Sequence, residues 1–571
     1  MRDRCRTRTT AVVAVAVAVL TVAGEAQAAP RRAPTRPDVA VASVAAPAAV
    51  IVGAPFQVVV TLAERSRRAG TAAATVSVAA GTSVATAPPV AVRAGRVVRV
   101  AVAVTLRSAG SATLAVHAAI AGDAVPRNNA ASARVAGVDF ALSPTEVLVD
   151  GFAGYGAQFN QHVYSGLGRD AGVSDDNVGD MEQKVVALAP QFVRLFFSRT
   201  ALGNPDRMAS FVRTAQLAQR TGATINVTMQ AAGPTPEVDI PAFADVVSGL
   251  VLNRGVANLR WATIQNEVNT TRITMDQYDQ MYRLLDARLT QNGVRDRVRF
   301  MGGDLVEQVS PLGQSQGDWF AFMATRMNDV LDAYSVHAYW NYWGVAKIPQ
   351  RLRIVRGIVG ALPATARKPV YVMEYGVRGK RPAGDAGPGT WEDGTPLEST
   401  NVSAFQQAWF AILAAKLGFS AAVKWDAYFA RYDNLPQAYT MIGGPQEGWP
   451  LRPSYHLTHL LTSTTRPGWR VVGVDGSSGS KLVVGYAGPA GELTVIGLDT
   501  AGATTNGIAT TMSSFDVGGF APHARLSLVR WNTDGTGTVG KPIRLQAKAA
   551  GTVHLGVPLQ AVFALTTLPL S

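Results

Sequence analysis

Two glutamates that each follow an apolar run have the residue type and spacing best suited to chemistry. Residues 262–264 are followed by Asn266 and Glu267, and residues 370–373 are followed by Glu374. Both runs are rich in apolar, β-branched or aromatic residues, which predicts buried strands that each end in a carboxylate. Two such carboxylates can cleave a glycosidic bond, because one protonates the leaving oxygen while the other attacks the anomeric carbon or activates water. The alternative is that each glutamate is a helix N-cap or half of a surface ion pair.

The strands that would position these glutamates belong to a repeating pattern. Between residues 139 and 465, short apolar runs alternate with longer helical patterns. Strands are expected at 151–157, 192–196, 224–229, 259–265, 298–302, 334–339, 370–373 and 421–425, and helices at 205–220, 240–253, 275–291, 347–361 and 401–417. Eight such units predict an α/β fold, a (β/α)₈ TIM barrel, whose catalytic groups lie at the C-terminal ends of the strands.

Further polar and aromatic residues lie at the expected strand ends. They are Arg194 on the second strand, His337 and Tyr339 on the sixth, and Trp425 on the eighth. Together with Asn266, Glu267 and Glu374, this pattern resembles the clan A glycoside hydrolases, in which an Asn-Glu pair ends the fourth strand and a glutamate ends the seventh. The resemblance covers the barrel, about residues 139–461, and several families of this clan also carry a C-terminal β-sandwich.

The resemblance implies a retaining mechanism. Glu267 would be the general acid/base and Glu374 the nucleophile, while Asn266 would bind the hydroxyl next to the anomeric carbon. An acid that works near neutral pH needs a raised pKa, and an apolar strand end beside Glu374 is expected to raise the pKa of Glu267. No metal or other cofactor is needed for this chemistry, and the sequence contains no cluster with metal-ligand spacing.

The remaining residues have expected roles around the glutamates. Arg194 would be costly inside a barrel unless it is paired, which predicts an ion pair with Glu374. Tyr339 or Tyr375 is expected to orient Glu374 through its phenol, and Trp425 offers a flat face for a sugar ring.

Two further predictions concern the sixth strand. His337 is expected to line the site, with a satisfied core histidine as the alternative. Trp340, Tyr342 and Trp343 follow the strand in an expected loop and predict further sugar subsites. Asp304 and Glu307, near the end of the fifth strand, are either substrate contacts or part of a solvated loop.

The barrel is expected to be flanked by two β-rich modules. Residues 39–138 contain short Val-, Ala- and Thr-rich runs separated by Gly, Pro and Ser, which predicts a β-sandwich. The residues 126–131 before its last strand, and Val52-Gly53 before its first long one, resemble the CARDB type of immunoglobulin-like module, here a spacer or adhesion unit. Residues 466–571 predict a second, C-terminal β-sandwich.

The first residues predict export. Residues 1–28 combine arginines, an apolar run and a small-x-small site, which predicts a signal peptide cleaved near Ala28/Ala29 and a linker at 29–38. The single cysteine, Cys5, would leave with the signal peptide, so a secreted chain without disulfides is expected.

Composition bears on the partners. The net charge of +13 comes mostly from scattered arginines, which argues for a solvated surface and against nucleic acid. The expected partner is a poly- or oligosaccharide, with a cell-wall surface as a second one; the oligomeric state is open. The alternative function is a non-catalytic cell-surface carbohydrate-binding or adhesion protein that uses the barrel as a scaffold. A transglycosylase would use the same residues as a hydrolase.

Overall fold

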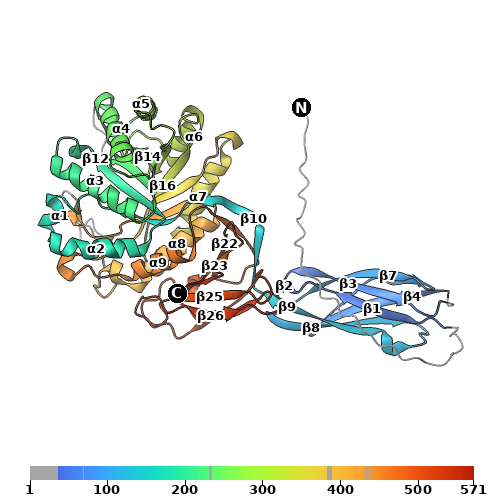
Figure 1. The fold of residues 1–571 in the computed structure, drawn as a ribbon. Coiled ribbons are helices and arrows are strands. Elements are labelled where there is room, and N and C mark those ends of the chain that lie inside the picture. The colour runs from blue at the N-terminus through green and yellow to red at the C-terminus, as the bar shows by residue number, and fades with distance from the viewer. Residues whose placement is uncertain are drawn as a thin grey trace, which may run out of the picture.

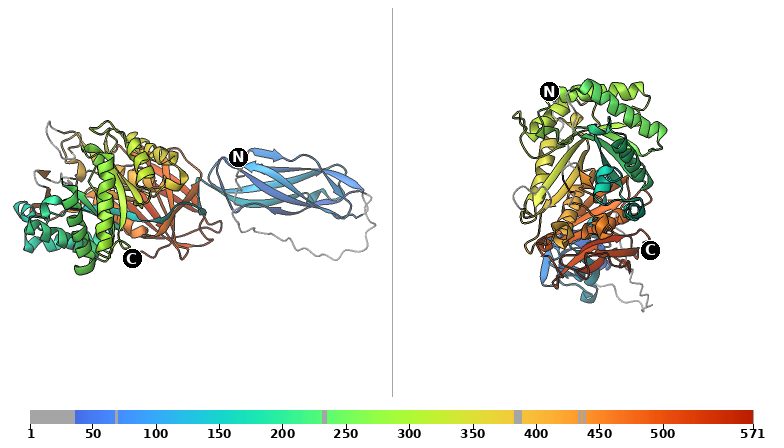
Figure 2. Two further views of the ribbon diagram at one scale, coloured as in Figure 1. Left: turned by 90° about the horizontal axis from the view of Figure 1, so that it is seen from above. Right: turned by 90° about the vertical axis from the view of Figure 1, so that its left-hand side faces the viewer.

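The computed structural model describes residues 36–67, 70–230, 235–381, 389–432, 435–436 and 439–570. The predicted signal peptide and most of the predicted linker lie outside these ranges. The described chain forms an elongated N-terminal β-module, a β/α barrel, and a C-terminal sheet that lies between them (Figures 1 and 2). Within the described ranges, every helix is too short or too polar to cross a membrane.

The N-terminal module consists of two sheets around an aliphatic core. In its strands, buried side chains alternate with exposed ones, and Val58, Val60 and Leu62 on one strand are fully buried. The core contains valine, leucine and alanine, and the partly buried Phe56 and Ile120 pack against it. The three-stranded sheet has the order β1 (Val39–Ala45), β3 (Pro55–Glu64), β7 (Val97–Thr105), and the other comprises β2 (Ala49–Ile51), β9 (Ala130–Val138), β8 (Gly110–Ile120), β4 (Thr71–Ala80) and β5 (Ser83–Thr86), with β6 (Val90–Arg93) paired to β4.

Eight parallel strands close the predicted barrel. They are β11 (Gly154–Phe159), β12 (Phe192–Ser198), β13 (Thr224–Gln230), β14 (Leu259–Ile264), β15 (Arg299–Leu305), β16 (Ala333–Asn341), β17 (Val370–Arg378) and β18 (Ala421–Lys424). Each overlaps a strand predicted from the sequence, and β11 pairs with both β12 and β18, which closes the ring. The prediction of a (β/α)₈ barrel is therefore confirmed.

Helices surround the barrel (Figure 1). They are α1 (Gly166–Asp170), α2 (Asp175–Leu188), α3 (Pro205–Arg220), α4 (Pro236–Asn253), α5 (Met275–Gln291), α6 (Gln316–Arg326), α7 (Lys347–Ala361), α8 (Asn401–Lys416) and α9 (Pro453–Thr464). Thr274 caps α5, because its side chain accepts a hydrogen bond from the backbone N–H of Gln277. The N-cap of α8 is Thr400, and Asn401 is already its first helical residue.

The C-terminal part forms a nine-stranded sheet. Its order is β26 (Ile543–Gln546), β25 (Arg525–Trp531), β28 (Val562–Thr566), β23 (Leu493–Asp499), β22 (Lys481–Ala487), β21 (Trp469–Asp475), β10 (Phe140–Phe152), β24 (Met512–Gly518) and β27 (Val553–Pro558). Strand β10 precedes the barrel in sequence but pairs with β21 and β24. Residues 140–152, which the sequence analysis places in the barrel domain, thus belong structurally to this sheet.

Helix α8 joins the barrel to the C-terminal sheet. It is buried on almost every side, since it packs against barrel strands β17 and β18 on one side and against β21 and β22 on the other. The hydroxyl groups of Tyr155 in the barrel and Tyr486 in the sheet form a buried hydrogen bond across the same junction. The barrel and the sheet therefore share one hydrophobic core.

Candidate active site

The two glutamates come from different strands of the barrel and meet at the C-terminal ends of these strands. This end of the barrel is called the mouth below. Glu267 follows the end of β14, and Glu374 is the fifth residue of β17, where it pairs in register with His337 of β16. The backbone at Gln265 (φ 61°) and Glu267 (φ 50°) has left-handed conformation, which is unusual for residues with a Cβ. This turn directs Glu267 to the mouth of the barrel.

The carboxylates are close to one another and only partly covered. A carboxylate oxygen of Glu267, a ring nitrogen of His337 and a carboxylate oxygen of Glu374 all lie within 4.8 Å of one another. The Glu267 side chain is 26% exposed and the Glu374 side chain 8% exposed, so neither carboxylate is fully covered by protein. Carboxyl groups about 5–5.5 Å apart suit double displacement, whereas inverting enzymes hold theirs about 6.5–9.5 Å apart to admit a water.

Arg194 forms hydrogen bonds and ion pairs with several residues at the mouth. Its side chain is fully buried, and Nη1 lies 2.8 Å from Oε2 of Glu374, which is the ion pair that the sequence predicts. Nη2 donates to Oδ1 of Asn266 at 2.7 Å and pairs with Oδ2 of Asp304 at 2.5 Å. One guanidinium group therefore fixes the nucleophile candidate, the amide next to the acid candidate, and a second carboxylate.

The sequence predicts that Asp304 is either a substrate contact or part of a solvated loop. In the structure it is neither. It is fully buried at the end of β15, where it accepts a hydrogen bond from Ser335 at 2.7 Å in addition to its ion pair with Arg194. Its Oδ1 also lies 3.4 Å from Nε2 of His337. Although burial raises the pKa of Asp304, Arg194 and His337 lower it well below the usual range.

His337 lies between three carboxylates. Nδ1 is 3.0 Å from Oε1 of Glu267 and 3.7 Å from Oε2 of Glu374, and Nε2 faces Asp304. Burial lowers the pKa of His337, but Glu374 and Asp304 outweigh burial and raise the pKa to about 9. The imidazole is therefore cationic at neutral pH, and the alternative of an uninvolved core histidine does not fit its position.

The pKa of Glu267 differs from the sequence-based expectation. Burial raises it, but the hydrogen bond and the positive charge of His337, together with Arg194, outweigh burial and lower it below the ordinary value. The expectation of a raised pKa was wrong for the free protein, because it considered the carboxylates without the imidazolium between them. Glu267 and His337 together still hold one proton at neutral pH.

Tyr339 orients the second oxygen of Glu374. Its hydroxyl donates to Oε1 at 2.5 Å, while Oε2 is occupied by Arg194. Tyr375, the other tyrosine considered from the sequence, stacks on Phe410 of α8 with ring centroids 5.0 Å apart and points away from the mouth. Both oxygens of Glu374 thus have fixed donors, which sets the direction of the carboxylate.

Aromatic residues form one wall of the mouth. Trp425, at the end of β18, stacks on Tyr432 with ring centroids 5.5 Å apart and an angle of 15°, and Phe196 of β12 packs against Trp425 at 5.5 Å. Lys424, whose Nζ donates to the carbonyl of Trp425, is buried and pairs with Glu398 at 3.5 Å. The buried ion pair therefore anchors the backbone of Trp425, while Tyr432 and Phe196 pack against its indole.

Trp340 does not reach the mouth, so its prediction as a substrate contact is corrected. Alternate residues of a strand face opposite sides, and because His337 and Tyr339 face the barrel interior, Trp340 faces outward. It is 1% exposed, stacks on Phe410 at 4.9 Å, and donates from Nε1 to Gln406 of α8. By contrast, Trp343 beyond the strand is 55% exposed.

The converging Glu267, His337 and Glu374 have the donor types of a metal site, but their surroundings suit another chemistry. Arg194 already pairs with Glu374, and the surrounding carboxylates raise the pKa of His337, so a metal would have to displace both an ion pair and a proton. Two positive charges at the ligand atoms oppose a divalent cation. The arrangement can instead deliver a proton through Glu267 and a nucleophile through Glu374.

Several residues of this network were not predicted from the sequence. Gln158 of β11 accepts from Arg194 at 3.4 Å, Thr228 of β13 accepts from it at 3.1 Å, and Tyr432 supports Trp425. Gln158 and Thr228 both lie near the ends of predicted barrel strands, and this shared position was the available signal.

Comparison with known proteins agrees with this fold. No protein-family model and no curated protein matches the chain. Among solved structures, the chain is similar to a GH30 endoxylanase from Clostridium papyrosolvens C71 (12% identity, TM-score 0.52, 75% of this chain and 99% of that one). It is also similar to the catalytic domain of the GH30 xylanase C from Talaromyces cellulolyticus (12%, 0.52, 75% and 99%) and to a glucosidase from Croceicoccus marinus (12%, 0.51, 76% and 99%). The barrel fold is thus one that glycoside hydrolases use.

Proposed function

We propose that this protein is a secreted retaining glycoside hydrolase that cleaves O-glycosidic bonds of a poly- or oligosaccharide by double displacement. The observation that carries the proposal is the convergence of one oxygen each of Glu267 and Glu374 to within 4.8 Å at the same end of the barrel, which favours the shorter carboxyl separation of a retaining enzyme. The xylanase and glucosidase names of structurally similar proteins agree with a carbohydrate substrate.

In the first step, Glu374 attacks the anomeric carbon while Glu267 delivers a proton to the leaving oxygen. Arg194 and Tyr339 hold the two oxygens of Glu374 in place for the attack. The leaving group departs with the proton, and the sugar is bound to Glu374 as an ester. In the second step, Glu267 takes a proton from water, which attacks the same carbon and releases Glu374.

The neighbouring residues assist substrate binding. Asn266 lies between Glu267 and Arg194 and is placed to bind the hydroxyl next to the anomeric carbon. Trp425 supplies a flat surface beneath the sugar at the cleavage point. The N-terminal module, with its two valine-rich sheets, acts as a CARDB-like spacer that holds the barrel away from a cell-wall surface.

A glycan panel followed by proton NMR of the first product tests the proposal. The full secreted chain is incubated with plant and microbial cell-wall polysaccharides, and the configuration of each new reducing end is recorded before mutarotation. Release of a product with the substrate's configuration supports the proposal, and transfer products at high glycan concentration would identify a transglycosylase. Inverted product would overturn the retaining mechanism, and glycan binding with no bond cleaved across the panel would favour the carbohydrate-binding alternative.

A further inference from the structure

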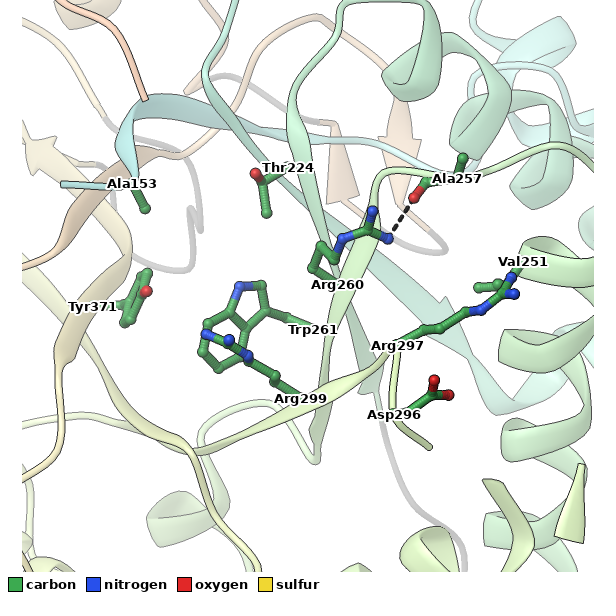
Figure 3. Close-up of a pocket in the computed structure, with 10 residues that line it drawn as sticks. All are labelled: Ala153, Thr224, Val251, Ala257, Arg260, Trp261, Asp296, Arg297, Arg299 and Tyr371. Atoms are coloured by element: carbon green, nitrogen blue, oxygen red, sulfur yellow. Dashed lines mark hydrogen bonds between the residues drawn. The ribbon is translucent and has the colours of Figure 1, made fainter. Parts of the chain in front are cut away.

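A cavity of about 670 Å³ opens at the end of the barrel opposite to the two glutamates (Figure 3). Its lining comes from the beginnings of strands: Thr224 and Arg299 are the first residues of β13 and β15, and Trp261 and Tyr371 lie near the starts of β14 and β17. Glu267 follows the far end of β14, so the two sites are separated by the length of the barrel. The cavity is therefore independent of the candidate active site.

The floor of the cavity consists of two aromatic side chains with unused donors. Trp261 and Tyr371 are each 6% exposed, and their ring centroids are 5.4 Å apart. Buried tryptophan and tyrosine usually have a partner for their polar atom. Nevertheless, across the ranges that the structure describes, neither Nε1 of Trp261 nor Oη of Tyr371 forms a hydrogen bond, although both residues line the cavity.

The rim carries three guanidinium groups and one carboxylate. Arg260 donates to the carbonyl of Ala257, and Arg299 lies over the Trp261 ring at 5.8 Å from its centroid. The side chains of Arg297 and Arg299 form neither a hydrogen bond nor an ion pair with any described residue, and Asp296 is the single acid in the lining. The cavity thus offers many hydrogen-bond donors and a local excess of positive charge.

We propose that this cavity is a second carbohydrate site, which binds an acidic sugar residue of a glycan. A volume of about 670 Å³ is within the range of small-molecule sites, about 300–1,000 Å³. Arg297 and Arg299 bind the carboxylate or sulfate of the sugar, because a guanidinium matches these planar or multidentate anions. The hydroxyl groups and ring oxygen accept from Tyr371 and Trp261 on the floor. Glycan bound here would keep the barrel on its polymer while the other mouth remains free.

Calorimetric titration of the full chain carrying Glu374→Gln, which prevents hydrolysis of the probe, tests this proposal. Trigalacturonate is the carboxylate probe, a sulfated disaccharide is the sulfate probe, and a neutral trisaccharide is the reference. We expect saturable binding of at least one anionic probe and at least tenfold weaker binding of the neutral one. Binding of the anionic probe should also weaken as salt is raised from 0.05 to 0.5 M, because the screening length then decreases roughly threefold.

The combined substitutions Arg297→Ala and Arg299→Ala should weaken binding of the anionic probe at least tenfold. Both side chains are exposed, so the fold should persist, and turnover of a small chromogenic glycoside by the otherwise unaltered enzyme should not change. Arg353→Ala, which removes an exposed arginine on α7, is the matched control and should leave binding intact. Absence of binding by both anionic probes overturns the proposal, as does binding that survives the double substitution or is lost with Trp425→Ala.

Discussion

Arg194 and Asp304 form an ion pair in which neither side chain is exposed, with Nη2 and Oδ2 2.5 Å apart. The two residues are 110 positions apart in sequence, and the barrel brings them together beneath the two glutamates. A buried charge without its partner is costly, so this pair makes the geometry of the mouth depend on both residues.

Asp304→Asn should therefore lower both stability and activity. Loss of the charge leaves Arg194 with Glu374 alone, and we expect the free energy of unfolding to fall by about 3 kcal/mol. A displaced Arg194 no longer fixes Glu374 and Asn266, which should lower kcat about 100-fold. Denaturant unfolding and steady-state kinetics measure the two effects.

The control is an arginine–aspartate pair on the surface. Asp329 pairs with Arg283 at 2.5 Å, but its side chain is 66% exposed, so Asp329→Asn should change the free energy of unfolding by less than about 1 kcal/mol. Equal losses in the two variants would contradict a special role for the buried pair.

Removal of each candidate catalytic carboxylate should have a distinct result. Glu374→Ala removes the nucleophile and should lower kcat by about 10⁵-fold or more. Glu267→Ala should lower kcat about 10²- to 10⁴-fold on natural glycans. On a glycoside with an activated leaving group, azide should restore turnover of the Glu267 variant and yield a glycosyl azide of retained configuration, identified by NMR.

Glu307→Ala serves as the control for these two variants. Glu307 lies just beyond β15 and pairs with Arg351 at 2.8 Å, but its side chain is 55% exposed. Its loss should leave kcat within about twofold of the unaltered enzyme. Normal turnover by Glu374→Ala would refute the assignment of the nucleophile.

Much of the barrel could be predicted because its signals are local. Helices α3, α5 and α7 have the bounds that the sequence predicts, since proline or a capping threonine marks the starts of α3 and α5 and an apolar period marks their length. The two glutamates were identified for the same reason: Glu374 directly follows a run of apolar residues, and Glu267 follows another after two amide residues.

The parts that were missed depend on distant residues. Strand β10 could not be assigned to the C-terminal sheet, because its partner β21 lies more than 300 residues later in the chain. The environment of Asp304 depends on Arg194, and the lowered pKa of Glu267 depends on His337, neither of which is a sequence neighbour. The outward orientation of Trp340, by contrast, could have been predicted from the sequence, because strand residues alternate and His337 and Tyr339 face inward.

Gly376 provides the space for Tyr339. A Cβ added at Gly376 would lie 2.9 Å from Cε1 of Tyr339 and 3.3 Å from Cδ1 of Tyr439. Gly376→Ala should displace the Tyr339 ring and its hydrogen bond to Glu374, which we expect to lower kcat about tenfold and stability by about 1–3 kcal/mol. Steady-state kinetics and thermal unfolding measure these effects.

A double-mutant cycle with Tyr339→Phe separates the lost hydrogen bond from general damage. If Gly376→Ala acts through the hydroxyl of Tyr339, the double variant should be scarcely slower than Tyr339→Phe alone. Gly357→Ala is the matched control, because a Cβ at this exposed position of α7 meets no atom within 4 Å; it should stabilise the helix by up to about 1 kcal/mol. Additive losses in the cycle would refute the link.

His337 should set the alkaline limit of activity. The pKa of His337 is raised to about 9, and that of Glu267 is lowered, so the proton needed by the leaving oxygen is held jointly by the two side chains. As pH rises through about 9, the pair loses this proton, and kcat/KM should fall. In His337→Asn, Glu267 holds the proton alone; although its pKa rises without the imidazolium, we expect the alkaline limb about one pH unit or more below that of the unaltered enzyme.

The dependence of kcat/KM on pH is the appropriate measurement, because it reports the free enzyme, the state in which these contacts exist. His554→Asn is the control: His554 pairs with Asp516 at 3.1 Å on the C-terminal sheet, its side chain is 57% exposed, and its loss should leave the profile unchanged. An alkaline limb that stays in place in His337→Asn would show that Glu267 holds its proton without His337. If the alkaline limb moves to lower pH in His337→Asn but not in His554→Asn, His337 helps to hold the proton that Glu267 delivers.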